Sequence, residues 1–410
     1  VVTKRRSFVK GAAGAGLFQI VAPHVLGGRE RTPPSETFGA VLIGAGGRGP
    51  GTFGDLSRKH KLAIREIARC DVKWVGKSDN KTRYTDFRRV LERNDVDVVA
   101  IGTPPHWHAL ISIAAMEAGK DVVCEKPMTR FVAEGRAVVE ASRRTKRIFQ
   151  VGTYGRFGAS NGRNDMRKIV RAGLVNGREV RVVHRGGFKV RQWSGPVQIK
   201  PQPVPGYLDW DMYCGPSPLK PFHPPRFGGM HRGYWDYDGG GLGDMGQHYL
   251  DPVQYIMGKD NESPVEIEAD TQKQHHDAVL PWREIRMKYA DGTVLILDGE
   301  NRYKEAAFLE GPNGKLFKGF KSDIPNLDKK LAEFPDPEPM VTDFIEAVRE
   351  RKKFALNEMN GHRSCTIVNL AKISLRTASR LRFDSDKQRF INDDHANSYI
   401  NQPMRGPWKL

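Results

Sequence analysis

The sequence predicts an α/β protein of two domains: an N-terminal doubly wound parallel sheet, then an α+β domain with an open, mixed and mainly antiparallel sheet. Two observations support this fold class. Strand-like and helix-like stretches alternate over residues 36–155, and their short Val- and Ile-rich runs suit a parallel sheet buried on both faces. Over residues 156–390, strand-like stretches follow one another directly, which is typical of antiparallel pairing. A chain of 410 residues accommodates two such domains.

The composition is that of a globular protein, because 39% of the residues are hydrophobic and 28% are charged. The formal net charge of +18 falls only to +14 without the four basic residues among the first 28 positions. Lysine and arginine are scattered among acidic residues, so we expect no nucleic-acid partner. The cysteines are too widely spaced for a metal site, and we expect them to be buried as small hydrophobic side chains: Cys70, Cys124, Cys214 and Cys365.

Residues 1–30 are predicted to be a twin-arginine export signal. Arg5 and Arg6 lie in a basic stretch that precedes the weakly apolar run 11–22, and Pro23 begins a turn-prone end. These features predict export by the twin-arginine machinery to the periplasm, or retention at the membrane if the signal is not cleaved. A disordered basic N-terminus is the alternative interpretation.

The first domain is expected to alternate strands with helices. We expect strands over 40–43, 64–70, 96–101 and 121–124 and helices over 84–91 and 108–118. In the second domain we expect strands over 180–183, 265–269, 285–289, 294–297 and 307–309, helices over 340–351 and 362–381, and a tail over 391–410. Residues 191–243 are rich in Pro, Gly and aromatic residues and too numerous for a connector, which predicts a binding loop.

A glycine-rich segment follows the first expected strand. It consists of Gly44, Ala45, Gly46, Gly47, Arg48 and Gly49. This order fits GxGxxG, in which the glycines allow a tight turn, a close approach to a pyrophosphate and close helix packing. Asp71 lies 25 residues beyond Gly46, after the next strand, where a carboxylate binds ribose hydroxyls and repels a 2'-phosphate. The segment predicts a Rossmann site for NAD, with NADP as an alternative; a glycine turn without a ligand is the other interpretation.

Lys126 follows the expected strand 121–124 in the order Cys124, Glu125, Lys126, Pro127. Ligands of open parallel sheets bind at the carboxyl ends of the strands, so Lys126 would point toward a nicotinamide. Its ammonium could bond a substrate hydroxyl and help to remove the proton. A surface lysine before a proline turn is the alternative.

Asp244 and His248 follow a run of glycines, four positions apart. If a helix begins at the glycines, both side chains lie on one face. A carboxylate and an imidazole there suit the interconversion of an alcohol and a carbonyl. Alternatively, Asp244 caps the helix and His248 packs in its core.

Together these motifs resemble the Gfo/Idh/MocA oxidoreductase family, which includes glucose-fructose oxidoreductase and inositol dehydrogenases. The resemblance also covers the segment Thr103, Pro104, Pro105, His106, Trp107, His108 and the closing residues Pro407, Trp408, Lys409, Leu410. It implies a Rossmann domain followed by an open sheet that covers the nicotinamide and mediates homo-oligomers. It further implies that Lys126, Asp244 and His248 are catalytic, and that Thr103, Pro104, His108 and Glu125 lie near the cofactor.

The sequence departs from the family after Asp71. Residues 72–83 form only a short polar stretch where the family usually has a full helix. We therefore expect a remodelled adenosine pocket, which weakens the preference for NAD over NADP. A non-catalytic sugar-binding protein on the same fold is an alternative that this departure favours.

Substrate contacts are expected from the long loop and from two arginines. The aromatic candidates are Trp193, Tyr207, Trp210, Tyr234, Trp235 and Tyr237, which could stack on a sugar ring. Arg156 and Arg232 could bind hydroxyl or carboxylate groups. Each of these residues could instead pack within the loop or the fold.

The expected function is NAD(P)-dependent oxidation of a CH–OH group in a sugar or sugar derivative. An exported enzyme has little free NAD to exchange, which predicts a tightly bound cofactor that is recycled on the enzyme. The glycine motif with an export signal also resembles the NAD-dependent glycosidases. A redox-neutral glycoside hydrolase, which oxidises, eliminates, adds water and reduces again, is therefore the alternative.

Overall fold

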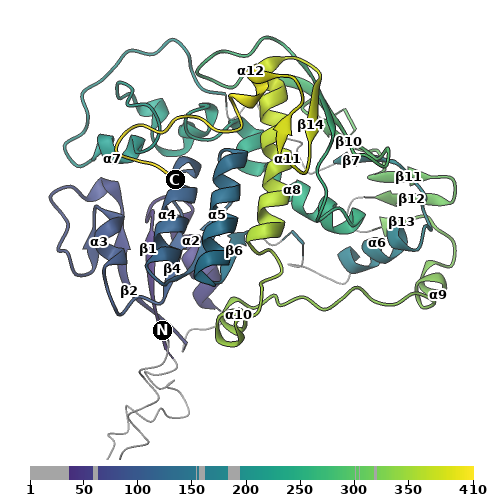
Figure 1. Ribbon diagram of the computed structural model, residues 1–410, viewed down its shortest axis with the longest axis horizontal. Helices are drawn as coiled ribbons and strands as arrows, with labels where there is room; N and C mark the ends of the chain where they lie inside the picture. The colour runs from purple at the N-terminus through teal and green to yellow at the C-terminus, as the bar shows by residue number, and fades with distance from the viewer. Residues whose placement is uncertain are drawn as a thin grey trace, which may run out of the picture.

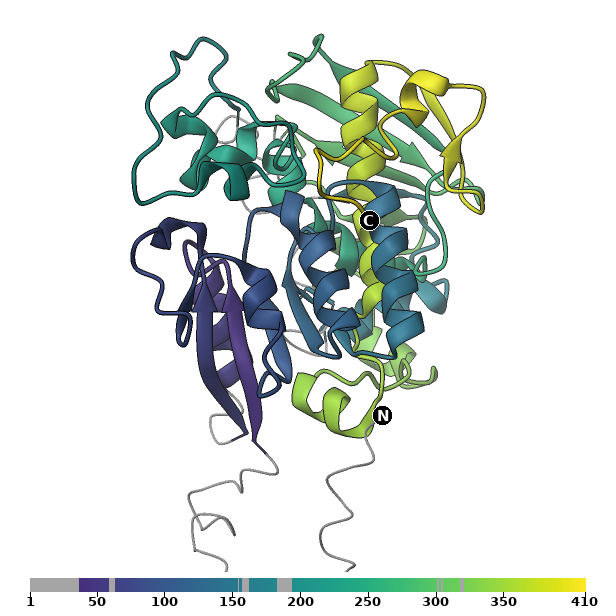
Figure 2. The ribbon, with the colours of Figure 1, turned by 60° about the vertical axis from the view of Figure 1, so that its left-hand side comes forward.

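The computed structural model describes residues 37–58, 63–153, 155–156, 162–182, 194–300, 302–303, 305–317 and 321–410. The predicted export signal and Trp193 lie outside these ranges. Figures 1 and 2 show two sheets side by side, with the long helix α11 (Glu358–Thr377) between them. Within the described residues, no helix combines the length and the apolarity that a membrane crossing needs.

The N-terminal sheet is parallel and has the strand order β3-β2-β1-β4-β5-β6. Its strands are β1 (Phe38–Ile43), β2 (Ile64–Cys70), β3 (Arg83–Tyr84), β4 (Val98–Ile101), β5 (Asp121–Glu125) and β6 (Phe149–Gly152). The helices of this domain are α2 (Gly49–Arg58), α3 (Phe87–Leu91), α4 (His108–Glu117) and α5 (Val132–Thr145). Every residue of β4 and β5 is buried, as a sheet covered on both faces requires. The order is that of a Rossmann fold, which confirms the prediction.

Within the described residues, the C-terminal sheet has nine strands in the order β13-β12-β11-β7-β10-β9-β8-β14-β15. They are β7 (Glu179–Val182), β8 (Glu266–Thr271), β9 (Trp282–Lys288), β10 (Val294–Asp298), β11 (Leu309–Gly311), β12 (Gly314–Phe317), β13 (Lys321–Ser322), β14 (Leu381–Asp384) and β15 (Arg389–Phe390). All described pairs are antiparallel except β7 with β10. This confirms the predicted mixed, mainly antiparallel sheet.

The remaining helices connect and cover the sheets. They are α6 (Gly162–Arg171), α7 (Trp210–Cys214), α8 (Gly240–Met257), α9 (Leu327–Leu331), α10 (Phe344–Glu350), α11 and α12 (Asp394–Asn397), with 3-10 turns at Val72–Trp74, Pro105–Trp107, Pro224–Arg226 and Gly228–Gly233. α11 packs against α5 of the first domain and α8 of the second. It therefore fixes the position of α8 over the N-terminal sheet.

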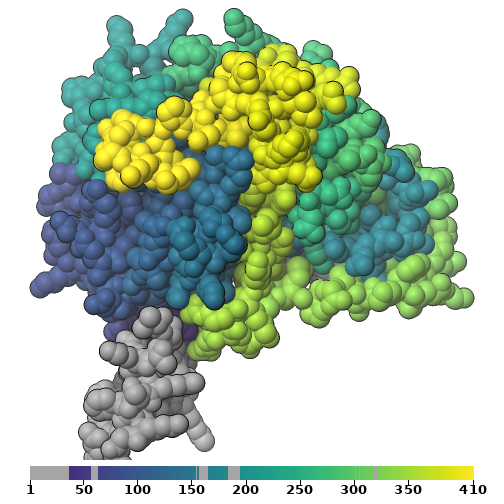
Figure 3. Space-filling model, viewed as in Figure 1, coloured from purple at the N-terminus to yellow at the C-terminus, as the bar shows by residue number. Residues whose placement is uncertain are grey.

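The end of the chain returns to the first domain. Phe344, Phe354 and Leu356 are buried in the hydrophobic core of the N-terminal sheet. The Trp408 ring lies edge-on to Trp107, with 4.7 Å between the ring centroids. Figure 3 shows this yellow C-terminal segment lying on the blue helices. The core of the N-terminal sheet therefore contains residues from late in the chain. All four cysteines are free and buried, as predicted.

Candidate active site

A cavity of about 230 Å³ lies at the carboxyl ends of the N-terminal strands. Its floor is formed by the glycine segment after β1 and by residues that follow β2, β4 and β5. Its roof comes from residues 212–244 of the second domain, drawn in teal above the N-terminal strands in Figure 2. This is the crevice where open α/β sheets bind their ligands.

The glycine segment forms a tightly packed turn, here called the glycine cradle, that side chains would force open. Gly44 has a φ of +87°, which other residues rarely adopt. A Cβ atom added to Gly49, the first residue of α2, would lie 1.9 Å from the Gly44 carbonyl oxygen. A Cβ atom on Gly102 would lie 2.4 Å from the Gly49 Cα. The turn therefore depends on glycines and directs the N-terminus of α2 at the cavity, as pyrophosphate binding requires.

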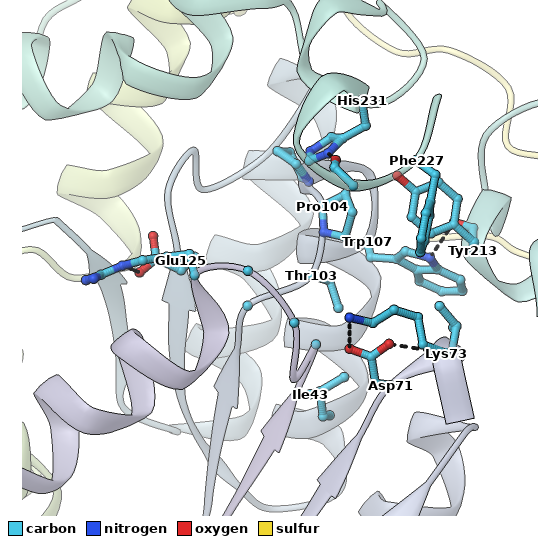
Figure 4. Close-up of a pocket in the computed structure, with 18 of the residues that line it drawn as sticks. Ile43, Asp71, Lys73, Thr103, Pro104, Trp107, Glu125, Tyr213, Phe227 and His231 are labelled. Carbon is cyan, nitrogen blue, oxygen red and sulfur yellow. Dashed lines mark hydrogen bonds and ion pairs between the residues drawn. The ribbon is translucent and has the colours of Figure 1, made fainter. Parts of the chain in front are cut away.

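Asp71 stands at the end of β2, close to Gly46, as predicted. It is buried, and its Oδ1 accepts a hydrogen bond from the Lys73 backbone N–H at 3.0 Å. The Lys73 ammonium lies 3.9 Å from Asp71 Oδ2 and 2.4 Å from where a Gly46 Cβ would be. Figure 4 shows both side chains at one side of the site. Lys73 was not predicted; its cation offsets part of the repulsion that Asp71 exerts on a 2'-phosphate.

Hydrogen bonds of the Glu125 side chain connect the glycine segment and α2 to the N-terminal sheet. The Glu125 carboxylate is buried and accepts hydrogen bonds from the Thr52 hydroxyl and, at 3.1 Å, from Arg48 Nε. Arg48 also pairs with Asp55 at 2.6 Å. Arg48 and Glu125 therefore both lie in the cavity wall. The hydrogen bonds to Glu125 connect the start of α2 to the end of β5.

The segment after β4 contributes Thr103 and Pro104 to the cavity. His108 lies behind them and is buried. Its Nε2 is 2.8 Å from the Thr103 carbonyl oxygen and its Nδ1 is 2.7 Å from that of Pro127. His108 therefore joins the loops after β4 and β5, and it is not among the described residues that line the cavity.

Lys126, Asp244 and Arg232 meet in the cavity wall. Lys126 Nζ lies 2.9 Å from Asp244 Oδ1 and 3.0 Å from the Asp244 carbonyl oxygen, and both side chains are about nine-tenths buried. Arg232 Nε is also 2.9 Å from Asp244 Oδ1. Burial opposes ionisation of Asp244, but the two cations outweigh it and lower the pKa of this carboxyl. Asp244 is therefore an ionised group between two cations.

His248 lies one helical turn beyond Asp244 on α8, which begins at the glycines, so the condition for placing both side chains on one face is met. Unlike Asp244, His248 is not among the described residues that line the cavity. Its Nδ1 is 2.6 Å from the hydroxyl oxygen of Thr153, which follows β6. Gln247, between them, accepts a hydrogen bond from the Met128 backbone N–H at 2.8 Å. α8 thus crosses the ends of β5 and β6, and it brings Asp244 to Lys126 and His248 to Thr153.

Arg156 has a different position from the one predicted. Its guanidinium is 1% exposed and bonds Asp251 at 2.7 and 3.2 Å and Asp260 at two distances of 2.7 Å. Four of its five N–H donors are thereby used. Arg156 is absent from the described residues that line the Lys126 cavity, and its guanidinium belongs to an internal ion-pair network.

Replacement of Arg156 by alanine is expected to lower the free energy of unfolding by about 3–5 kcal/mol, because Asp251 would remain buried without its partner. NADH affinity should stay within about threefold. Urea unfolding and NADH titration measure both. Asp260→Asn is the matched comparison and should cost less, because the Asp260 side chain is 23% exposed. Equal stability of Arg156→Ala and the wild type would contradict the structural role.

Most of the predicted loop aromatics are buried in the hydrophobic cores of the protein. Tyr234, Trp235, Tyr237 and Trp210 are buried outside the cavity, and Tyr207 is exposed. The Tyr234 hydroxyl, a predicted substrate ligand, donates to the Pro196 carbonyl at 2.8 Å instead. The side chains that line the roof include Tyr213, Phe227, His231, Arg232 and Asp238. Figure 4 shows His231 above Pro104, with Phe227 and Tyr213 to the side of it, next to Trp107. Except for Arg232, these roof residues were not predicted, since the loop has no periodicity that separates its packed residues from its lining ones.

Comparison with known proteins agrees with this architecture. Residues 38–153 match the model "Oxidoreductase family, NAD-binding Rossmann fold", and residues 160–410 match "Oxidoreductase family, C-terminal alpha/beta domain" of the GFO/IDH/MocA group. Levoglucosan dehydrogenase from Pseudarthrobacter phenanthrenivorans is 27% identical over 175 residues, which are 43% of this chain and 36% of that protein. A glycosyl hydrolase family 109 protein from Solibacter usitatus is 30% identical over 166 residues, 35% of this chain and 37% of that protein.

The solved structures show the same fold over nearly their whole length. WlbA dehydrogenase from Bordetella pertussis, in complex with NADH and UDP-GlcNAcA, is 16% identical with a TM-score of 0.57, over 85% of this chain and 99% of that one. Levoglucosan dehydrogenase with NADH and levoglucosan is 18% identical with a TM-score of 0.52, over 84% and 99%. Because the family models together cover both domains, the chain belongs to the Gfo/Idh/MocA family of NAD-binding oxidoreductases.

Proposed function

We propose that the protein oxidises a secondary hydroxyl group of a cyclic polyol, sugar or sugar derivative. The observation that supports this proposal most is the cluster of Lys126, Asp244 and Arg232 in the wall of a cavity that begins at a Rossmann glycine cradle. The likeness to levoglucosan dehydrogenase supports the same substrate class. That relative and the family 109 protein are each matched over little more than a third of their length, so the substrate stays a proposal.

The cavity fits a dinucleotide, because its wall contains Gly46 and Gly47, which have no side chains, and the Asp71 carboxylate at the end of β2. NAD⁺, when bound, supplies the acceptor for the hydride that leaves the substrate carbon. Gly46 and the N-terminus of α2 would hold the pyrophosphate, and Asp71 would bind the adenosine ribose.

In the proposed mechanism, Lys126 donates a hydrogen bond to the reacting hydroxyl oxygen and stabilises the charge that develops on it. Asp244 keeps the Lys126 side chain in place through the 2.9 Å contact. His248, one helical turn beyond Asp244, would take the hydroxyl proton as a general base. Arg232, in the roof of the cavity, forms an ion pair with Asp244 and would orient a second oxygen of the substrate.

We further propose that the cofactor is retained and recycled on the enzyme, that residues 1–30 direct export by the twin-arginine route, and that the nine-stranded sheet mediates a homo-oligomer. Heat denaturation of purified protein and identification of the released nucleotide tests retention. NAD or NADH in a near-stoichiometric amount is expected. Protein that contains no nucleotide and binds none on titration would instead favour the non-catalytic alternative.

The second candidate function is redox-neutral hydrolysis of a glycoside, which the likeness to family 109 glycosyl hydrolases favours. A transient ketone would acidify the neighbouring C–H group, elimination would break the glycosidic bond, water would add, and the hydride would return. Aryl glycosides offered without added cofactor separate the two functions. Only the hydrolase releases the aglycone, whereas only the dehydrogenase accumulates NADH from added NAD⁺ and a free sugar.

Asp71→Ala is expected to weaken NADH binding by about 10- to 100-fold, because a carboxylate that accepts hydrogen bonds from the ribose hydroxyls is lost. NADPH affinity should fall less, since Lys73 remains to meet a 2'-phosphate. Fluorescence titration with both nucleotides measures the change. Equal losses for NADH and NADPH would contradict the proposed ribose contact.

A further inference from the structure

Asp238 is an acidic residue in the cavity wall that has no role in the mechanism above. It precedes α8, and a Cβ atom added to Gly243 would lie 2.3 Å from Asp238 Oδ1. The carboxyl group therefore lies against the first turn of α8. It shares the cavity wall with Lys126, Arg232 and Asp244.

Neither carboxyl oxygen of Asp238 has a hydrogen-bond partner among the described residues, and both are buried. Most buried polar atoms in proteins are hydrogen-bonded. Asp238 lies in the wall of a cavity that can hold a ligand. The ligand can therefore supply the hydrogen-bond partner that the protein does not.

The surroundings of Asp238 favour its protonated form. Burial, followed by the Asp244 carboxylate, raises the pKa of Asp238 to about 8, although the cations of Lys372, Arg232 and Lys126 oppose this. Lys372 on α11 is itself buried, and burial lowers its pKa to about 8. In its protonated form, which these surroundings favour, Asp238 has one O–H donor and one C=O acceptor.

We propose that Asp238 binds the substrate as a carboxylic acid, donating a hydrogen bond to one substrate oxygen and accepting one from a neighbouring hydroxyl. The inference rests on the proposed oxidation of a polyol. Because Asp238 shares the wall with Lys126, it would contact oxygens adjacent to the reacting one. The ligand class is then a cyclic polyol or sugar with adjacent hydroxyl groups.

Infrared difference spectra of wild type minus Asp238→Asn test the protonation state without any substrate. At pH 7 the wild type is expected to show the C=O band of a protonated carboxyl that the variant lacks. The band should disappear as the pH is raised through about 8. A carboxylate signal at pH 7 in place of this band would overturn the inference.

The kinetic test uses NAD⁺ reduction with myo-inositol, D-glucose and levoglucosan. Asp238→Asn keeps a neutral donor and acceptor, so its KM should stay within about threefold of the wild-type value. Asp238→Ala should raise KM by about 10- to 100-fold with a smaller change in kcat. Asp236→Asn is the matched control, because Asp236 pairs with Lys220 at 2.5 Å.

The outcomes separate this inference from the proposed function. NADH titration of every variant shows whether the fold is intact. If the active wild type and Asp238→Ala have equal KM values, the inference fails while the proposed function stands. If the wild type oxidises none of the three compounds, the proposed function fails for this substrate class, and the inference fails with it.

Discussion

Replacement of Lys126 by methionine is expected to lower kcat by at least about 100-fold, the usual range for a lost donor to a developing negative charge. Methionine keeps the apolar stem, and Asp244 would keep Arg232 as a partner at 2.9 Å. The fold and the glycine cradle should therefore persist, with NADH affinity within about threefold. Stopped-flow measurement of NADH formation with saturating NAD⁺ gives the rate of the chemical step.

Lys352→Met is the control for this prediction, because Lys352 is 60% exposed and pairs only with Glu350 among the described residues. It should behave as the wild type. Activity of Lys126→Met within about tenfold of the wild type would show that another group contacts the reacting oxygen. A parallel loss of NADH binding and activity would indicate that Lys126 supports the cofactor site instead.

Gly49→Ala is expected to abolish tight NADH binding and to lower the free energy of unfolding by about 1–3 kcal/mol, as overpacking does. The added Cβ would lie 1.9 Å from the Gly44 carbonyl oxygen, so the turn must open. That movement would displace the backbone N–H groups that hold a pyrophosphate. Urea unfolding and NADH titration measure the two effects.

Gly54→Ala on the same helix is the matched control, because nothing lies within 4 Å of its added Cβ. In a helix interior this change should stabilise the protein by about 0.5–1 kcal/mol and leave NADH binding unchanged. If both alanine variants lost NADH binding equally, the effect would belong to α2 as a whole and not to the close contact at Gly49.

The sequence predicted the features that depend on local periodicity and turns. The apolar runs predicted the buried strands β4 and β5. The two glycine-rich segments predicted the turn after β1 and the region where the helix that begins at Gly240 starts. The short stretch after Asp71 was also predicted to lack a full helix, and it forms only the 3-10 turn Val72–Trp74.

The features that sequence reasoning missed depend on contacts between distant residues. Arg156 was expected to bind substrate, but Asp251 and Asp260, about 100 positions later, occupy its guanidinium. Tyr213 and Phe227 line the cavity while Tyr234 packs behind it, and no periodic pattern distinguishes them. Asp238 could be recognised only once its burial and lack of a partner were visible.

The crystal structure of the complex with NADH tests the central claim most directly. We expect the nicotinamide ring between the ends of β4 and β5 and the wall that holds Lys126 and Asp244, with the pyrophosphate over Gly46 and Asp71 at the adenosine ribose. NADH that is bound with its nicotinamide ring outside this cavity would contradict the proposed mechanism.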